Sequence, residues 1–334
     1  MAAPLFMGAE DIDFQGPGSN PPSYAPGTIG SSRSGWARSN TAALSFPAGS
    51  PSKSNPFTGT LTGWLSFRCY AYGNGMAVSF GRSGTNCGFG VQTNGSNQTQ
   101  LVKYNGSSVT VLATDTTSGL TIGGGLFWPV WIDVQDFGSE ATVLVYIQNT
   151  LVISGTFDLT QTGMTDYFDS VFGGGGGGGE MWCSEIFATI EDPRSYPGLK
   201  TDLATATGTV SQWSGNVPAN ITLQTYSEAA PEYDSVNEQE QDYTLTAPPA
   251  GPLSVVARKR VAFATVSEGS PVSRFALGWR NGSHGVGYGS GAVKTPVAGV
   301  WATYEQIDNI DPTTGVAFAF GDMSGIQSAI EALT

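Results

Sequence analysis

The most persistent pattern in the chain is an alternation of hydrophobic and polar positions between residues 59 and 190. Successive side chains of a β-strand point to opposite faces, so a period of two indicates strands that are buried on one face. The predicted strands are residues 61–70, 76–80, 89–92, 101–104, 109–112, 128–134, 142–147 and 151–154. Many short strands separated by turn residues predict an antiparallel β-sandwich.

Two turns set the pairing expected for these strands. Asn105-Gly106 separates two of them, and Asn-Gly tolerates positive φ at both central positions of a tight hairpin. Gln148-Asn149-Thr150 joins another pair in a second hairpin. Pro129 opens a further strand, and because proline lacks a backbone donor it restricts the start of that strand to an edge or a bulge.

The regions on either side of the sandwich differ from it in composition. Residues 1–58 are rich in Gly, Pro, Ser and Asn, which prevents a helix because proline lacks the donor and glycine costs entropy. This segment is expected to cross a surface or add an edge strand, and to attach the protein to its surroundings. The sandwich is assigned to residues 59–192, and a second β-rich domain to residues 193–334.

The end of the sequence has a different period. Ile326, Ala329, Ile330 and Leu333 fall on one helical face, and Asp322 can cap the first turn. We therefore expect a short C-terminal helix packed on the second sheet. The predicted fold class is all-β, with this single helix as the exception.

Composition narrows the choice of partners. The 334 residues carry a formal net charge of −13, and only 12% of them are charged. Phosphate contacts need clustered Lys and Arg, so nucleic acid is not an expected partner. Arg258-Lys259-Arg260 is the one dense basic group, and we interpret it as a solvated strand end. No stretch approaches the roughly 20 apolar residues of a membrane helix, and no secretory signal is evident.

Few residues offer reactive chemistry. His284 is the single histidine and lies in a glycine-rich stretch, where a turn exposed to water is the expected role rather than a triad or a zinc site. Cys69, Cys87 and Cys183 form no C-x-x-C pair, so reduced structural thiols are expected. A Cys69–Cys87 bridge is the alternative for an assembled extracellular particle.

The acidic run around Glu238, Glu240 and Asp242 is the strongest catalytic candidate. Carboxylates at i, i+2 and i+4 of a strand share one face, and retaining glycosidases need two carboxyls about 5–5.5 Å apart. Calcium binding is a second interpretation, because oxygen ligands suit calcium. We prefer a solvated acidic strand or loop, since the run lies outside the predicted sandwich in a segment with little strand propensity. We therefore assign no catalytic residue and no cofactor-binding residue, we leave the identity of any metal ligand open, with calcium as the candidate ion, and we expect a protein that is not an enzyme.

Exposed aromatic side chains could bind sugar by stacking. The candidates by residue type are Trp36, Trp128, Trp131 and Trp213. Aromatic residues on alternating strands more often belong to the core, which is the interpretation we prefer for these four.

Several pieces of the sequence resemble known families. Residues 57–190 resemble a concanavalin A-like (laminin-G-like) jelly roll, on Gly63-Trp-Leu-Ser-Phe67, residues 128–134 and residues 143–154. Residues 183–194 and 207–214 together resemble a Ser-Glu strand, Asp-x-Arg and Gln-Trp-Ser arrangement of tailed-phage particle proteins. The stretches 311–318 and 321–327 are similar to the ends of tail-associated or fibre-like virion proteins.

The resemblance implies a non-catalytic bacteriophage structural protein located in the virion. Such a tail- or fibre-associated protein would contribute to particle assembly and host attachment, bind other virion proteins, and form a homo-oligomer such as a trimer. Two alternatives stay open. One is a lectin-like module that binds a host-surface glycan, and the other is a glycoside hydrolase.

Overall fold

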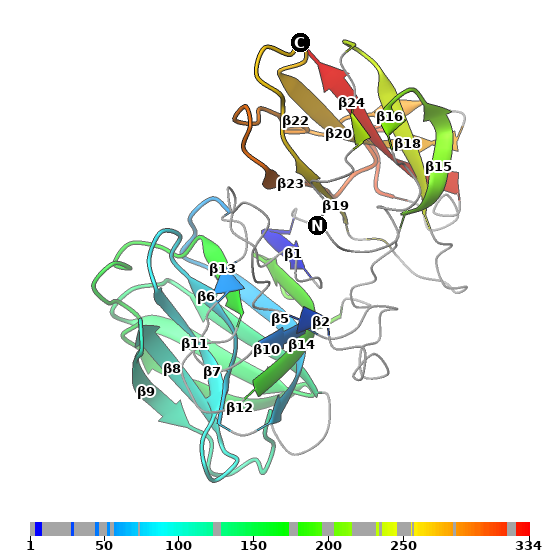
Figure 1. Ribbon diagram of the computed structural model, residues 1–334. Helices are drawn as coiled ribbons and strands as arrows, with labels where there is room; N and C mark the ends of the chain where they lie inside the picture. The colour runs from blue at the N-terminus through cyan, green and yellow to red at the C-terminus, as the bar shows by residue number, and fades with distance from the viewer. Residues whose placement is uncertain are drawn as a thin grey trace. The chain divides into compact units, whose positions relative to one another are not determined.

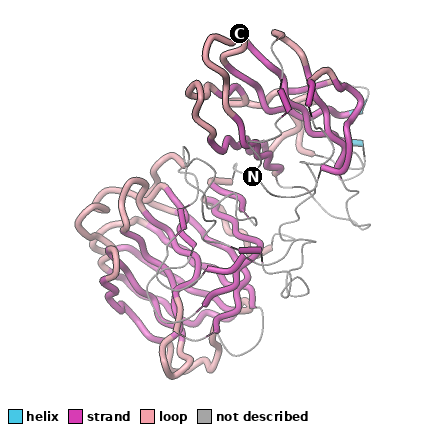
Figure 2. Tube along the Cα trace, in the orientation of Figure 1, coloured by secondary structure: helices cyan, strands magenta, loops and turns pink. Residues whose placement is uncertain are grey.

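The computed structural model describes residues 4–8, 28–29, 44–46, 52–53, 57–72, 74–122, 128–173, 180–195, 204–215, 232–233, 236–245, 255, 257–282, 285–318 and 325–334. These residues fall into two compact units that divide between Thr201 and Asp202. Strands account for nearly all the regular structure, which confirms the all-β class (Figure 2). Within the described ranges, no helix has the length and apolar character needed to cross a bilayer.

The N-terminal unit is a sandwich of two antiparallel sheets (Figure 1). Sheet 1 has eight strands, and β14 is its junction because it pairs with β5, β3 and β1. In order, sheet 1 is β12 (Thr150–Phe157), β11 (Ala141–Ile147), β10 (Trp128–Gln135), β5 (Gly63–Tyr72), β14 (Glu180–Thr189), β3 (Leu44–Phe46) and β2 (Thr28–Ile29), with β1 (Phe6–Gly8) also on β14.

Sheet 2 faces sheet 1 across the core and has six strands. In order, it is β4 (Ser52–Lys53), β13 (Ser170–Gly173), β6 (Met76–Gly81), β7 (Cys87–Thr93), β8 (Thr99–Asn105) and β9 (Ser108–Thr114). Strands adjacent in the sheets are often distant in sequence, as with β5 and β14. Two such facing sheets form the predicted antiparallel sandwich, and the described strands of the first 58 residues extend both of them.

A continuous apolar core fills the space between the two sheets. It consists of 27 buried hydrophobic residues, and an aromatic cluster of Phe80, Phe89, Phe137 and Phe168 lies within it. The rings of Phe80 and Phe168 are 4.4 Å apart between centroids. Burying one such side chain contributes about 1.5–3 kcal/mol, so this core is the main source of stability for the unit.

The two predicted hairpins form, with one change of register. Gln148 and Asn149 have φ of 54° and 66°, the two positive values that a type I′ turn requires. In the other hairpin Asn105 already pairs with Ser108, so the loop is Gly106-Ser107 and only Gly106 has positive φ. Glycine therefore occupies the first central position and not the second, and the loop lies one residue later in the chain than the Asn-Gly pattern predicted.

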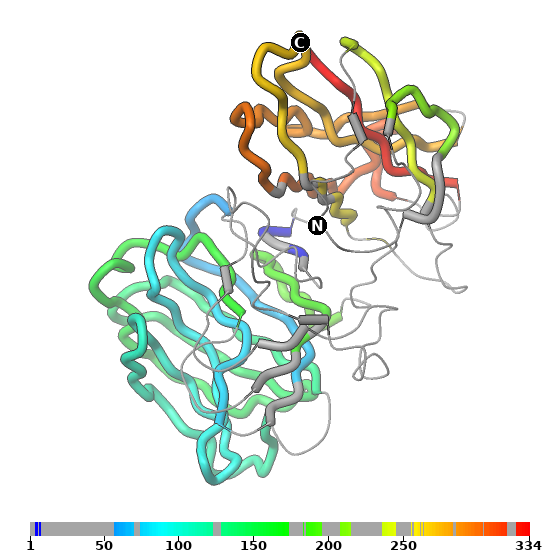
Figure 3. The backbone as a smooth tube through the Cα atoms, in the orientation of Figure 1, coloured from blue at the N-terminus to red at the C-terminus, as the bar shows by residue number. Residues whose placement is uncertain are grey.

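The C-terminal unit contains a six-stranded antiparallel sheet, sheet 3, and two separate pairs of strands (green to red in Figure 3). Sheet 3 runs β15 (Ala204–Ser211), β18 (Glu240–Leu245), β24 (Ile326–Leu333), β20 (Arg274–Asn281) and β21 (Val286–Gly287), with β22 (Val293–Lys294) also on β20. The remaining pairs are β19 (Arg258–Ala264) with β23 (Ala302–Asp308), and β16 (Ser214–Gly215) with β17 (Glu232–Tyr233).

The predicted C-terminal helix is wrong, because residues 326–333 form β24 in the middle of sheet 3. Ile330 pairs with Gln241 on one side and with Leu277 on the other. Apolar residues four positions apart share a face in a helix and also in a strand, so Ile326 and Ile330 fit both patterns. Pairing along both edges outweighs the local helical preference. Asp322, the expected cap, lies outside the described residues.

Candidate functional site

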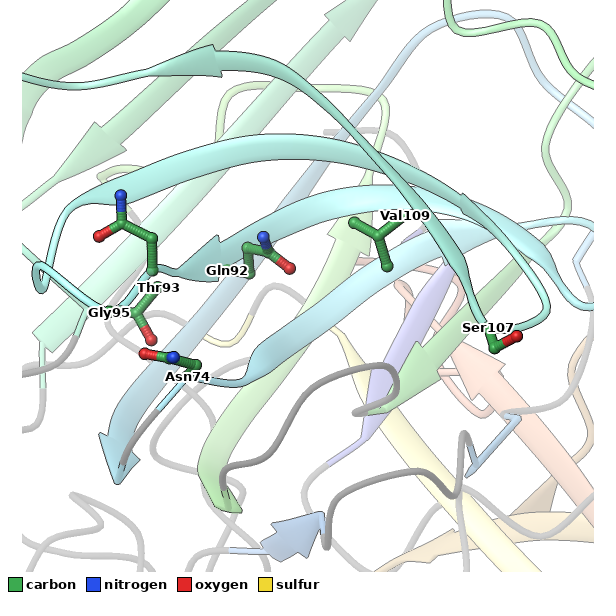
Figure 4. A pocket seen from close by; sticks show the side chains of 7 residues that line it. Asn74, Gln92, Thr93, Gly95, Ser107 and Val109 are labelled. Atoms are coloured by element: carbon green, nitrogen blue, oxygen red, sulfur yellow. The ribbon is translucent and has the colours of Figure 1, made fainter.

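A polar pocket of about 360 Å³ opens on sheet 2, on the face that points away from the core (Figure 4). Phe89 and Val91 of β7 point into the core, and the period of two therefore turns Gln92 to the opposite face. The pocket is lined by Asn74, Gln92, Thr93, Asn94, Gly95, Ser107 and Val109. These residues come from β7, β9 and the connections after β5, β7 and β8, so no single segment makes the site.

A ladder of side-chain amides crosses the strands beside this pocket. Gln92 Nε2 donates to Gln100 Oε1 at 2.9 Å, and Gln100 Nε2 donates to Thr114 Oγ1 at 3.0 Å. The three residues are direct cross-strand partners on β7, β8 and β9. The ladder uses a donor of Gln92 and so fixes the orientation of its amide next to the pocket.

The turn between β7 and β8 makes one wall of the pocket rigid. Asn94 Oδ1 accepts the backbone N–H groups of Ser96 and Gln98, both at 2.9 Å, and Asn94 Nδ2 donates to Gln98 Oε1 at 2.9 Å. Asn97 adopts φ of 56°, which asparagine tolerates better than most residues. The asparagine-rich sequence therefore holds the wall in a single conformation.

Tyr104 lies on the same face of sheet 2 and is buried. Its hydroxyl is 2.8 Å from Ser79 Oγ, and a Cβ at Gly88 would lie 2.3 Å from Tyr104 Oη. Glycine at position 88 thus lets the phenol lie against the backbone of β7. Burial raises the pKa of Tyr104, although the hydrogen bond from Ser79 opposes this, so Tyr104 stays neutral near pH 7.

The chemistry of the pocket is that of hydrogen bonding. Its described lining consists of amides, hydroxyls, a glycine and Val109, without an ionisable side chain. Such a site can orient a neutral polar ligand but supplies neither a general acid nor a nucleophile. Sequence reasoning missed this pocket. The available signal was the alternation of Gln92 and Gln100 with core residues, next to an asparagine-rich turn.

The acidic run lies elsewhere, in the C-terminal unit. Glu238 is exposed in a turn with φ of 62°, whereas Glu240 and Asp242 share one face of β18. The three carboxylates therefore do not share a single face as the spacing predicted. The preferred interpretation of a solvated acidic strand is also wrong for Asp242, which is fully buried, because Arg280 of β20 binds both strand carboxylates.

The basic triplet is not a solvated strand end. Alternation along β19 turns Arg258 and Arg260 inward, with 9% and 7% of their surface exposed. The Arg258 guanidinium lies 4.3 Å from the centre of the Trp279 ring, and Arg260 Nη1 donates to the carbonyl of Gly278 at 3.0 Å. Lys259 forms an ion pair with Glu305 at 2.7 Å. Arg258 and Arg260 are thus part of the interior, and Lys259 is ion-paired at its edge.

The described tryptophans that were candidates for sugar stacking lie away from the pocket. Trp131 is buried with 8% of its surface exposed, and Trp128 and Trp213 are half-buried. Trp213 Nε1 donates to the carbonyl of Gln239 at 3.2 Å. None of these three lines the pocket. Trp36 and His284 lie outside the described residues.

The three cysteines are buried and unbridged. Cys69 pairs in register with Cys183 on β14, so its neighbouring thiol is Cys183 and not Cys87. Cys87 Sγ instead donates to the carbonyl of Thr162 at 3.1 Å. Burial raises the pKa of the Cys69 and Cys183 thiols, which makes both unreactive. Among the described residues, no group of three or more His, Cys, Asp and Glu side chains could hold a metal ion.

Comparisons with known proteins return structural likenesses only. No family model and no curated protein matches the chain. Alginate lyase Aly36B is 10% identical, with a TM-score of 0.35 over 57% of this chain and 100% of the lyase. A SAP-like pentraxin from Limulus polyphemus is 13% identical, with a TM-score of 0.28 over 40% of this chain and 65% of the pentraxin. A legume lectin-like domain from Entamoeba histolytica is 8% identical, with a TM-score of 0.29 over 45% of this chain and 80% of that domain.

The expectation that the protein is not an enzyme is corrected by these likenesses. The matching structures are mainly enzymes, among them the alginate lyase, a sialidase and a xylan β-1,4-xylosidase. The sandwich therefore gives no reason to exclude catalysis. Sugar-active and lectin-like proteins are what this chain resembles in structure. At this level of similarity the likenesses assign no activity, ligand or residue to it.

Proposed function

We propose that the N-terminal sandwich binds a neutral carbohydrate in the pocket on sheet 2. The observation that supports this is the lining, in which amide and hydroxyl groups from several segments converge without a charge. Sugar hydroxyls both donate and accept hydrogen bonds, and side-chain amides offer both functions to them. A volume of about 360 Å³ lies at the small end of ordinary ligand sites, so a short segment of a glycan is the expected occupant.

The hydrogen-bonded surroundings support the same proposal. The side chains of Gln92 and Asn94 are already oriented by Gln100 and Gln98. Binding therefore costs less side-chain entropy than it would with free glutamine and asparagine side chains. Val109, with 37% of its surface exposed, offers an apolar contact for the C–H groups of a sugar ring.

A glycan array with the full chain, followed by calorimetry on any hit, tests the proposal. Gln92→Ala and Asn94→Ala should each weaken binding about 3- to 10-fold, because each removes a hydrogen-bonding group of the pocket. Thr110→Ala is the matched control, since Thr110 is exposed on β9 next to Val109 but does not line the pocket. Absence of glycan binding, or equal binding by all variants, would refute the proposal.

We further propose, from the sequence resemblance of residues 183–194 and 207–214, that the protein is a component of a tailed-phage particle. In that setting the glycan would belong to the host surface, and other virion proteins and further copies of the chain would be its partners. Mass spectrometry of purified particles tests the location, and light scattering tests the oligomeric state. Particles that lack the protein would remove the virion proposal and leave the pocket proposal intact.

A further inference from the structure

Four charged side chains lie close together on one face of sheet 3. Glu240 and Asp242 are two residues apart on β18 and so point the same way, and cross-strand pairing places Glu331 of β24 opposite Glu240. Arg280 of β20 reaches both strand carboxyls. Its Nε donates to Asp242 Oδ2 at 2.5 Å, and its Nη2 donates to Glu240 Oε1 at 2.6 Å. One guanidinium is thus shared between two carboxyl groups.

Asp242 is the buried member of this group, and one of its oxygens lacks a donor. The backbone N–H of Val210 donates to Asp242 Oδ2 at 3.0 Å, where the pairing of β15 with β18 is interrupted. Asp242 Oδ1 is buried, yet it has no hydrogen-bond partner among the described residues. A buried carboxylate oxygen without a donor is costly, so the arrangement calls for a further proton near Oδ1.

We propose that Glu240 and Asp242 form a carboxyl pair that shares one proton. This proton stabilises the attachment of β15 to sheet 3 through the hydrogen bond between Val210 and Asp242. The proton resides on Glu240 and is donated to Asp242, which satisfies the buried aspartate. Asp242 in turn holds the N–H of Val210. The backbone N–H of Thr209 is held beside it by Gln327 Oε1 at 2.8 Å. Protonation of Glu240 is thereby linked to the position of residues 209 and 210.

The surrounding charges favour this proton. Burial raises the pKa of Glu240 to about 7, its hydrogen bond with Asp242 adds to the rise, and Arg280 opposes it. The other ionisable groups that face the pair are Glu331 on β24, Tyr288 after β21 and Arg260 on β19, while β15 contributes none. Burial raises the pKa of Tyr288 and lowers that of Arg260 to about 10. Tyr288 therefore stays neutral and Arg260 stays charged, so neither changes its charge near pH 7.

The sign of the pH effect follows from proton counts. Glu240 has a pKa near the ordinary 4.5 when unfolded and about 7 when folded, so between these values the folded state binds more protons. The contribution of Glu240 to stability is then fully present below about pH 4.5 and is lost as the pH rises through about 7. Above that pH, Glu240 gains a negative charge beside Asp242 and opposite Glu331 on β24. The attachment of β15 is weakest there.

Hydrogen exchange read by mass spectrometry on the full chain at pH 5 and pH 8 tests this device. After correction for intrinsic rates, peptides covering residues 204–211 should exchange about tenfold faster at pH 8, a value limited by solvent screening at the partly open Glu240. Glu240→Gln places a neutral donor where the protonated acid lies and should remove most of that difference. Glu238→Gln is the control, because Glu238 is exposed in the preceding turn and should leave the difference unchanged.

Two outcomes would overturn the proposal. One is wild-type protein with equal protection of residues 204–211 at both pH values, a result that needs no variant to fold. The other is a Glu240→Gln protein that keeps the full pH dependence. Peptides of the N-terminal unit give an internal reference, since the device lies entirely in the C-terminal unit and is independent of the pocket on sheet 2.

Discussion

The interiors of the two units differ in composition, because one is mainly apolar and the other buries charged and polar side chains beside small apolar clusters. Among the described residues, the N-terminal sandwich has one large apolar cluster of 27 buried residues and a smaller cluster of four. The described part of the C-terminal unit has two clusters of only three buried hydrophobic residues each, and Arg258, Arg260, Gln306 and Asp308 are buried as well. A continuous apolar core loses stability mainly through lost volume, whereas a polar interior loses it through a single unsatisfied group. The comparison teaches that two β-rich units of one chain can be sensitive to different kinds of substitution.

Truncation of the aromatic cluster should have the largest effect. Phe168 is fully buried and contacts the rings of Phe57, Phe80, Phe89 and Phe137. Phe168→Ala should destabilise the N-terminal unit by about 3–5 kcal/mol, through lost burial and the cavity left behind. Urea unfolding followed by peptide-resolved hydrogen exchange measures it unit by unit. An equal loss in the C-terminal unit would show that the two interiors are not independent.

Removal of one buried carboxylate should break the C-terminal interior. Asp308 accepts hydrogen bonds from Trp279 Nε1 and Gln306 Nε2, both at 2.8 Å. Asp308→Ala leaves Trp279 Nε1 without its acceptor and removes one of the two acceptors of Gln306 Nε2, and it should cost about 2–3 kcal/mol in the same unfolding experiment. Glu140→Ala, at an exposed carboxylate of the other unit, is the control and should change little. A neutral result for Asp308→Ala would mean that water replaces the carboxylate.

The hydroxyl of Tyr104 tests how much one buried hydrogen bond contributes in the mainly apolar N-terminal unit. Tyr104→Phe removes the partner of Ser79 Oγ, which is itself fully buried. The expected loss is about 1 kcal/mol in the N-terminal unit, measured by the urea midpoint. The matched variant Tyr243→Phe acts in the C-terminal unit and should leave the midpoint of the N-terminal unit unchanged.

The smallest effect is expected at the surface. The Arg194 guanidinium lies 4.3 Å from the centre of the Tyr146 ring and pairs with Asp192 at 2.6 Å. Arg194→Lys keeps the charge but loses planar stacking and the second hydrogen bond, at a cost of about 0.5 kcal/mol. The difference should shrink in high salt. A loss in the free energy of unfolding larger than that of Tyr104→Phe would contradict the expectation that this surface contact contributes little to stability.

Sequence patterns predicted the sandwich well because its strands have one apolar face. Strand β11 alternates strictly in burial, and its type I′ turn lies where the Gln-Asn pair predicted it. Sequence patterns failed where the burial of a polar side chain depends on a partner that is distant in the sequence. Asp242 can be buried because it pairs with Arg280, which is 38 residues away in the sequence. Likewise, no residue next to Arg260 in the sequence indicates its hydrogen bond to the carbonyl of Gly278. The pocket escaped prediction for the same reason, since its residues converge only after β7, β8 and β9 have paired.

The central position of β24 has a consequence for the order of assembly. This strand separates β18 from β20 in sheet 3, although it follows both of them along the chain. During synthesis β18 and β20 therefore emerge with open edges and no common neighbour. The C-terminal unit must wait for residues 326–333 and then close around them, a step that exposes it to mispairing with other chains. Pairing of this late strand is thus the step that covers the inner edges of both β18 and β20.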